Sequence, residues 1–104
     1  MAGLQNKNPP KNGDWTPLHL AAKNGHIKIC KLIMKRLDNK NPAAINGWTP
    51  LHEAAQKGHK NICKMILKNT EDKMPTTQDD ITPAAIAMEN DHIELAFLLM
   101  MIPN

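Results

Sequence analysis

Aromatic side chains are scarce in this sequence, whose 104 residues include two Trp, one Phe and no Tyr, or 3% aromatic residues. Proteins that bind single-stranded nucleic acid stack its bases on several exposed aromatic rings. A conventional single core also draws much of its buried area from aromatic residues. The composition therefore disfavours both a base-stacking platform and an ordinary aromatic core.

Long apolar segments are also absent, and cysteines are few. The longest uninterrupted apolar stretch is residues 95–102, whereas a membrane-spanning helix needs about 20 residues. The first ten residues, MAGLQNKNPP, have no apolar region of the kind found in secretory signals. Cys30 and Cys63 are too few for a disulfide scaffold. We expect a single domain over residues 1–104 that lies inside the cell, in the cytoplasm or nucleus, without a membrane segment.

The sequence repeats itself every 33 residues, as the positions of Thr16, Thr49 and Thr82 show. The first block reads WTPLHLAAKNGHIKICKLIMK, the second WTPLHEAAQKGHKNICKMILK, and the third ITPAAIAMENDHIELAFLLMM. No insertion breaks the register. We therefore place three repeats at about residues 8–40, 41–73 and 74–104.

Each block predicts two short helices. The Thr can cap the first helix, and the Pro that follows it suits the first helical position. Gly25 and Gly58 can adopt the left-handed conformation that ends this helix. A second helix is expected to begin near His26, His59 and His92. Its apolar positions should face the core, which in the first repeat are Ile29, Cys30, Leu32, Ile33 and Met34.

The motif T-P-L-H-x-A-A-x-x-G-H at this period resembles the ankyrin repeat, over nearly the whole chain. The resemblance implies a mainly all-α fold, a solenoid of three helix-turn-helix units joined by β-hairpin-like finger loops. These fingers would lie at about Asn8–Trp15, Asn41–Trp48 and Pro75–Ile81. It also implies that the histidine of T-P-L-H forms local hydrogen bonds that steady the finger, and that the chain is a non-catalytic protein–protein interaction module.

Positions that differ between the blocks are free of packing roles and would line a concave face of finger tips and first helices. By the resemblance, these positions would bind an unidentified protein partner: Asn12, Trp15, Leu20, Lys23, Asn24, Ile45, Asn46, Trp48, Glu53, Gln56, Lys57, Gln78, Asp79, Ile81, Ile86, Glu89 and Asn90. Within this set, Trp15, Trp48 and Ile81 have two interpretations. They form a hydrophobic ladder for the partner, or each packs on the neighbouring finger and stiffens the array.

Charge is divided unevenly along the chain. Residues 1–70 contain twelve Lys and Arg against three acids, whereas residues 71–104 contain one Lys against seven acids, giving formal charges of +9 and −6. This asymmetry suits an acidic partner on the first two repeats, or head-to-tail contact between copies. Lysines such as Lys28, Lys31 and Lys35 are expected to solvate the outer face, and nucleic-acid binding through them is the weaker hypothesis.

The two ends suggest an alternative function, a self-associating structural or scaffold module. Residues 4–9 resemble residues 37–42, the linker after a repeat, so the chain is expected to begin in the tail of a preceding unit, as a fragment of a longer array would. Phe97, Met101 and Ile102 replace outward-facing basic residues of the earlier repeats. Further repeats would cover them, or they form a self-association surface in a homo-oligomer, or they tuck against the third repeat.

No pattern in the sequence predicts catalysis, a metal site or a cofactor. The five histidines occupy positions set by the repeat, and none has the short spacing of a zinc site. Neither a nucleophile elbow nor a phosphate-binding glycine loop is present. Cys30 and Cys63 occupy equivalent buried positions on packed helices about 8–10 Å apart, too far for a disulfide. We expect two free, buried thiols and no enzyme activity.

Overall fold

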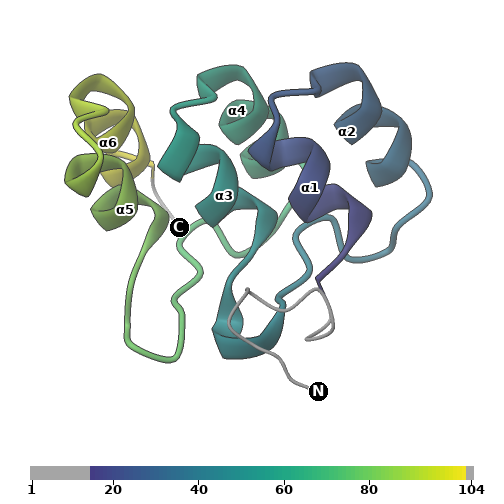
Figure 1. Ribbon diagram of the computed structural model, residues 1–104, viewed down its shortest axis with the longest axis horizontal. Coiled ribbons are helices and arrows are strands. Elements are labelled where there is room, and N and C mark those ends of the chain that lie inside the picture. The colour runs from purple at the N-terminus through teal and green to yellow at the C-terminus, as the bar shows by residue number, and fades with distance from the viewer. Residues whose placement is uncertain (1–14, 103–104) are drawn as a thin grey trace, which may run out of the picture.

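The computed structural model describes residues 15–102, which form three antiparallel helix pairs stacked in series (Figure 1). The pairs are α1 (Pro17–Lys23) with α2 (Ile27–Met34), α3 (Pro50–Lys57) with α4 (Lys60–Lys68), and α5 (Pro83–Glu89) with α6 (Ile93–Met100). Neighbouring pairs pack through α1 on α3, α3 on α5 and α2 on α4. Within this range there is no strand. The expected solenoid of three helix-turn-helix units is confirmed.

The first helix of each pair begins as its sequence predicts. Thr16, Thr49 and Thr82 are the N-caps, and each side-chain oxygen accepts a hydrogen bond from the backbone N–H three residues on. A proline follows each cap at the first helical position. At the other end, Gly25 and Gly58 have φ of 74° and 76°, the left-handed conformation that favours glycine.

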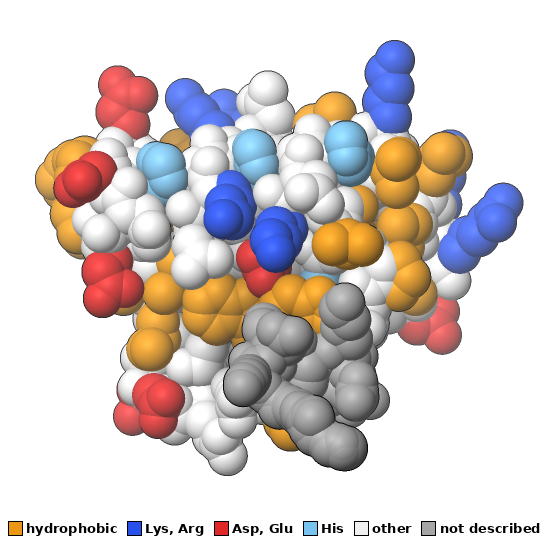
Figure 2. Space-filling view, in the orientation of Figure 1, with side chains coloured by type: hydrophobic (Ala, Val, Ile, Leu, Met, Phe, Trp, Pro, Cys, Tyr) orange, Lys and Arg blue, Asp and Glu red, His pale blue; other side chains and the backbone are white. Residues whose placement is uncertain are grey.

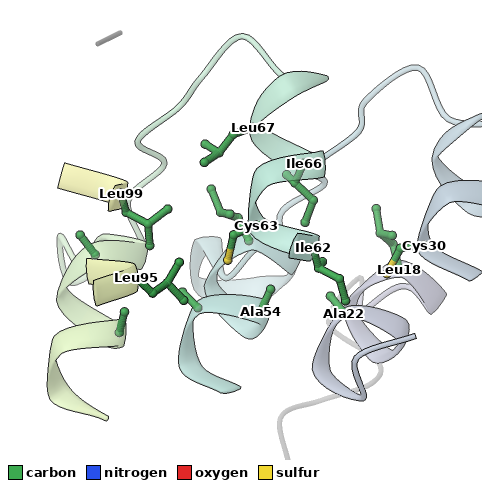
Figure 3. Close-up of a cluster of buried hydrophobic side chains, with 14 of the residues drawn as sticks. Leu18, Ala22, Cys30, Ala54, Ile62, Cys63, Ile66, Leu67, Leu95 and Leu99 are labelled. Atoms are coloured by element: carbon green, nitrogen blue, oxygen red, sulfur yellow. The ribbon is translucent and has the colours of Figure 1, made fainter. Parts of the chain in front are cut away.

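The core runs continuously through the stack, because each pair buries its apolar side chains against the next pair (Figure 3). Leu18, Cys30, Ile62 and Cys63 are all buried there. Ala22 and its equivalents are small enough for the helices to approach closely. No pair has a sufficient core of its own, which is why the repeats depend on one another.

The expected inward face of α2 needs a correction. Cys30 and Met34 are buried, but Ile29 and Leu32 are exposed. Both side chains point toward the open end of the stack, where residues 15–102 supply no helix to cover them. Ile62, the equivalent of Ile29 in the second repeat, is buried because the first repeat packs against it.

The connections between pairs are tight turns rather than paired strands. In the second finger, Ala44 N–H donates to Trp48 O at 2.7 Å around the short 3-10 helix η1 (Ile45–Gly47). In the third, Thr77 N–H donates to Ile81 O at 3.0 Å. The first finger lies almost wholly outside the described residues.

Lysines that recur at the repeat period hold the chain after each second helix. The ammonium group of Lys40 donates to the carbonyls of Met34 and Leu37 at the end of α2. Lys73 donates in the same way to Leu67 and Thr70 after α4. These bonds satisfy carbonyl groups that lack a partner within the helix.

Candidate functional site

The face formed by α1, α3, α5 and the fingers carries the residues that the sequence predicted to bind a partner. Figure 2 shows this face, where hydrophobic side chains form a band between the helices and the fingers, with Lys and Arg side chains just above it. Exposure divides the predicted residues into three groups. Exposed are Leu20, Lys23, Asn24, Ile45, Asn46, Lys57, Gln78, Asp79, Glu89 and Asn90; half-buried are Trp15, Trp48, Gln56 and Ile81; buried are Glu53 and Ile86. Asn12 lies outside the described residues.

The two tryptophans at the finger bases stack on histidines of their own repeats. The ring centroids of Trp15 and His19 are 4.6 Å apart, and those of Trp48 and His52 are 5.0 Å apart. These ring contacts lie within each repeat. Each of the two Trp residues is half-buried, so part of it remains exposed.

The stacked histidines join each repeat to the next finger. Thr16 N–H donates to Nδ1 of His19 at 3.1 Å, so the proton of this neutral ring sits on Nε2, which donates to Trp48 O at 2.8 Å. His52 repeats the arrangement, with Nε2 2.9 Å from Ile81 O. The local hydrogen bonds implied for these histidines are confirmed, and the bond to the next finger is a further role.

Burial lowers the pKa of His19 and His52 below the ordinary value of 6.5. The hydrogen bonds to the carbonyls of Trp48 and Ile81 oppose the shift, and the mutual repulsion of the two rings adds to it for His52. A protonated ring would lose the Nδ1 acceptor that binds the Thr N–H. The neutral histidine is therefore the form that fits this part of the fold.

Glu53 is a charged residue buried in the middle of this face. Only 5% of it is exposed, and burial raises the pKa of its carboxyl above the ordinary value. The Trp48 indole N–H and the ammonium groups of Lys23 and Lys57 oppose that rise. Even so, Glu53 Oε1 and Trp48 Nε1 are buried and complete no hydrogen bond of standard geometry with the described residues.

The equivalents of Glu53 in the other repeats are Leu20 and Ile86. Ile86 is as deeply buried as Glu53, so an aliphatic side chain suits this environment. A buried, incompletely bonded carboxylate destabilises a fold, and such groups gather at functional sites. Comparing the three repeats in the sequence predicted that Glu53 lies on the surface, and so missed its burial. Its aliphatic equivalents in the other two repeats were a sign that this position is apolar.

Lysines flank this buried pair on both sides. Lys23 at the end of α1 and Lys57 at the end of α3 are exposed and act on the pKa of Glu53. The position equivalent to Lys23 in the third repeat is Glu89. The first repeat thus carries an ammonium group where the second carries the amide of Gln56 and the third carries a carboxylate. In the second repeat, Lys57 carries its charge one position later.

The thiols and histidines offer no second site. Cys30 and Cys63 are free and buried, as expected, and burial raises the pKa of Cys63 to about 12. Within residues 15–102, no three His, Cys, Asp or Glu side chains are grouped so as to hold a metal ion.

The apolar residues at the end of α6 differ in their exposure. Phe97 and Met101 are exposed, while Ile102 is half-buried and packs against the core. Packing against the core therefore accounts for the burial of Ile102, but Phe97 and Met101 remain exposed.

Comparison with known proteins agrees with the geometry. The family model described as ankyrin repeats matches three copies, over residues 2–77 and 36–103. No match was found among curated proteins. None of the helices in the described part of the chain is long and apolar enough to cross a membrane.

Proposed function

We propose that this chain, which belongs to the ankyrin-repeat family, is a non-catalytic module that binds a protein partner along its concave face. Ankyrin repeats are in general protein–protein interaction modules, and the family is typically non-catalytic. We further propose that the binding surface is centred on the first two repeats and that the partner is acidic there.

The observation that carries the proposal is the pair formed by Glu53 and Trp48. Together they leave a buried acceptor and a buried donor incompletely bonded, side by side on the face that the fingers and helices enclose. Both atoms lie below the surface, so the partner would meet the exposed part of Trp48 above them. Half-buried Trp is also a frequent centre of binding energy, and its truncation costs about 2 kcal/mol or more at such sites.

The partner segment over the first two repeats is acidic. Lys23 and Lys57 stand exposed beside the buried pair, and their attraction would orient an acidic segment and speed its association. Glu89 would repel the same segment in the third repeat. We therefore place the contact on α1, α3 and the second finger, and not on α5.

A quantitative pull-down tests this placement, with the wild-type chain and two double variants as bait. Lys23→Gln with Lys57→Gln removes two charges from the concave face. Lys60→Gln with Lys64→Gln removes the same charge from α4, whose lysines are exposed on the outer face. Proteins that the wild type retains should be lost with the first variant and kept with the second.

Trp48→Ala serves as the second variant, with circular dichroism as a check of folding because Trp48 stacks on His52. A folded Trp48→Ala chain should lose the same proteins. Equal losses from both lysine variants would instead indicate unspecific attraction to a basic chain. Retention by the concave variants would contradict the proposed surface.

A further inference from the structure

We propose that copies of this chain associate head to tail, with the first repeat of one copy stacking on the third repeat of another. This association uses the two ends of the stack and goes beyond the proposed function. The repeat–repeat junctions inside the chain show the side chains that become buried when one helix pair stacks on another.

The first repeat exposes the surface that later repeats bury. Ile29 on α2 is 48% exposed, whereas its equivalent Ile62 is 2% exposed because the preceding pair covers it. Leu20 on α1 is likewise exposed, whereas its equivalent Ile86 is buried. Together with Leu32, these residues form an apolar N-terminal end face that matches the internal junctions in position and in chemistry.

The third repeat exposes the opposite surface. Met100 on α6 is 51% exposed, whereas its equivalent Met34 is 4% exposed beneath the following pair. Met88 on α5 is exposed, whereas Ala22 in the same position is fully buried. Met100 and Met88 define the C-terminal end face, and Figure 2 shows hydrophobic side chains at both ends of the stack. Methionine adapts its shape to an opposing surface, which suits a junction between copies.

Charge favours this pairing over the pairing of two like ends. Lys28 and Arg36 occupy repeat positions that face the preceding pair, as their equivalents Glu94 and Ile102 do inside the chain. Glu89 and Asp91 occupy repeat positions that face the following pair, as their equivalents Lys23 and Gly25 do. Two N-terminal faces would bring basic side chains together. Head-to-tail contact brings basic side chains to carboxylates, so it should weaken as salt screens the charges.

One contact of the internal junctions changes at the junction between copies. Inside the chain, Nε2 of His59 lies 3.1 Å from Lys23 O and Nε2 of His92 lies 3.1 Å from Gln56 O. The equivalent bond between copies would join His26, which is exposed, to Glu89 O of the other copy.

The residue that blocks this bond is Asp91. The rings of His59 and His92 lie directly over Gly25 and Gly58, where an added Cβ would be 2.9 Å and 2.7 Å from Cε1 of the ring. The third repeat has Asp91 at that position, with φ of 65°, so its Cβ keeps the ring of His26 away. The junction between copies is therefore weaker than those inside the chain, and the association should be reversible.

Sedimentation equilibrium over a range of protein and salt concentrations tests the proposal. The mass of the wild-type chain should exceed the monomer at high concentration and return toward it as salt is added. Ile29→Asp and Met100→Asp should each raise the dissociation constant more than about tenfold. Ile45→Asp is the matched control, since Ile45 is an exposed aliphatic residue in the finger of the middle repeat, away from both end faces.

Mixing the two end-face variants distinguishes head-to-tail stacking from a symmetric dimer. The Ile29→Asp chain keeps its C-terminal face, and the Met100→Asp chain keeps its N-terminal face. Their mixture should therefore give a one-to-one dimer that grows no further, although each is monomeric alone. Circular dichroism confirms that both variants are folded.

A second pair of variants examines the geometry of the junction. Asp91→Gly should lower the dissociation constant by about fivefold, the effect of one hydrogen bond. Asp91→Asn keeps the Cβ, removes the charge and should not tighten the association. A wild-type chain that stays monomeric at every concentration overturns the proposal. So does a mixture that fails to form the dimer, or loss of association in Ile45→Asp.

Discussion

Replacing Glu53 with Ile should stabilise the fold while it weakens partner binding. Ile occupies the equivalent position in the third repeat, where it is as deeply buried as Glu53. The substitution removes a buried carboxylate oxygen without a complete hydrogen bond, which costs about 1–3 kcal/mol. It also loses the attraction of Lys23 and Lys57, about 0–1 kcal/mol. The favourable position of an acid in the first turn of α3 adds about 0.3–1 kcal/mol to the loss.

The net effect at pH 7 is a gain of about 1 kcal/mol in the free energy of unfolding. For a domain of this size, each 1 kcal/mol raises the melting temperature by about 4–8 °C. The gain depends on pH, since the folded state raises the pKa of Glu53 above its ordinary value of 4.5. Below pH 4.5 the carboxyl is neutral in both states, and the penalty of burying its charge disappears.

Urea unfolding of the wild type and Glu53→Ile at pH 7 and pH 4 measures both parts of this prediction. The difference in free energy should be larger at pH 7 than at pH 4. Glu53→Gln is the matched control, since it removes the charge and keeps the shape. A variant less stable than the wild type at pH 7, or a gain that does not change with pH, would refute the reasoning.

Three further predictions concern the framework. Burial holds the pKa of His19 and His52 below 6.5 in the folded state, so the unfolded chain binds more protons in mild acid. The free energy of unfolding should therefore decline as the pH falls below 6.5. Urea midpoints measured between pH 7.5 and pH 5 test this, and a midpoint that does not change would contradict it. The Cys63 thiol, buried and with its pKa raised to about 12, should react with a thiol reagent far more slowly in the native than in the unfolded chain, and fast native labelling would show that it is accessible. Gly58→Ala should destabilise the fold by more than about 1 kcal/mol, because it combines φ of 76° with a Cβ only 2.7 Å from the His92 ring; thermal unfolding measures the loss, and an unchanged melting temperature would count against this packing.

The sequence predicted the helix boundaries because the signals that set them are local. Each Thr–Pro pair starts a helix in all three repeats. Gly58 adopts a left-handed φ readily because glycine has no Cβ atom. Even Asp91, the exception to this glycine rule, adopts the left-handed conformation that its position requires.

Burial on the concave face and at the ends could not be predicted in the same way, because it depends on neighbours. Ile29 and Ile62 are the same residue at the same repeat position, yet one is exposed and the other buried. Glu53 resembles a surface residue in the sequence and is buried only because the stack surrounds it. In a repeat protein, therefore, exposure is a property of the junction rather than of the residue.

Hydrogen–deuterium exchange of the chain with and without a partner recovered by pull-down tests the central claim most directly, since it reports which backbone segments the partner protects. We predict added protection in the second finger and at the C-terminal ends of α1 and α3, near Lys23, Trp48 and Lys57. Protection confined to α2, α4 and α6, with the concave segments unchanged, would contradict the account.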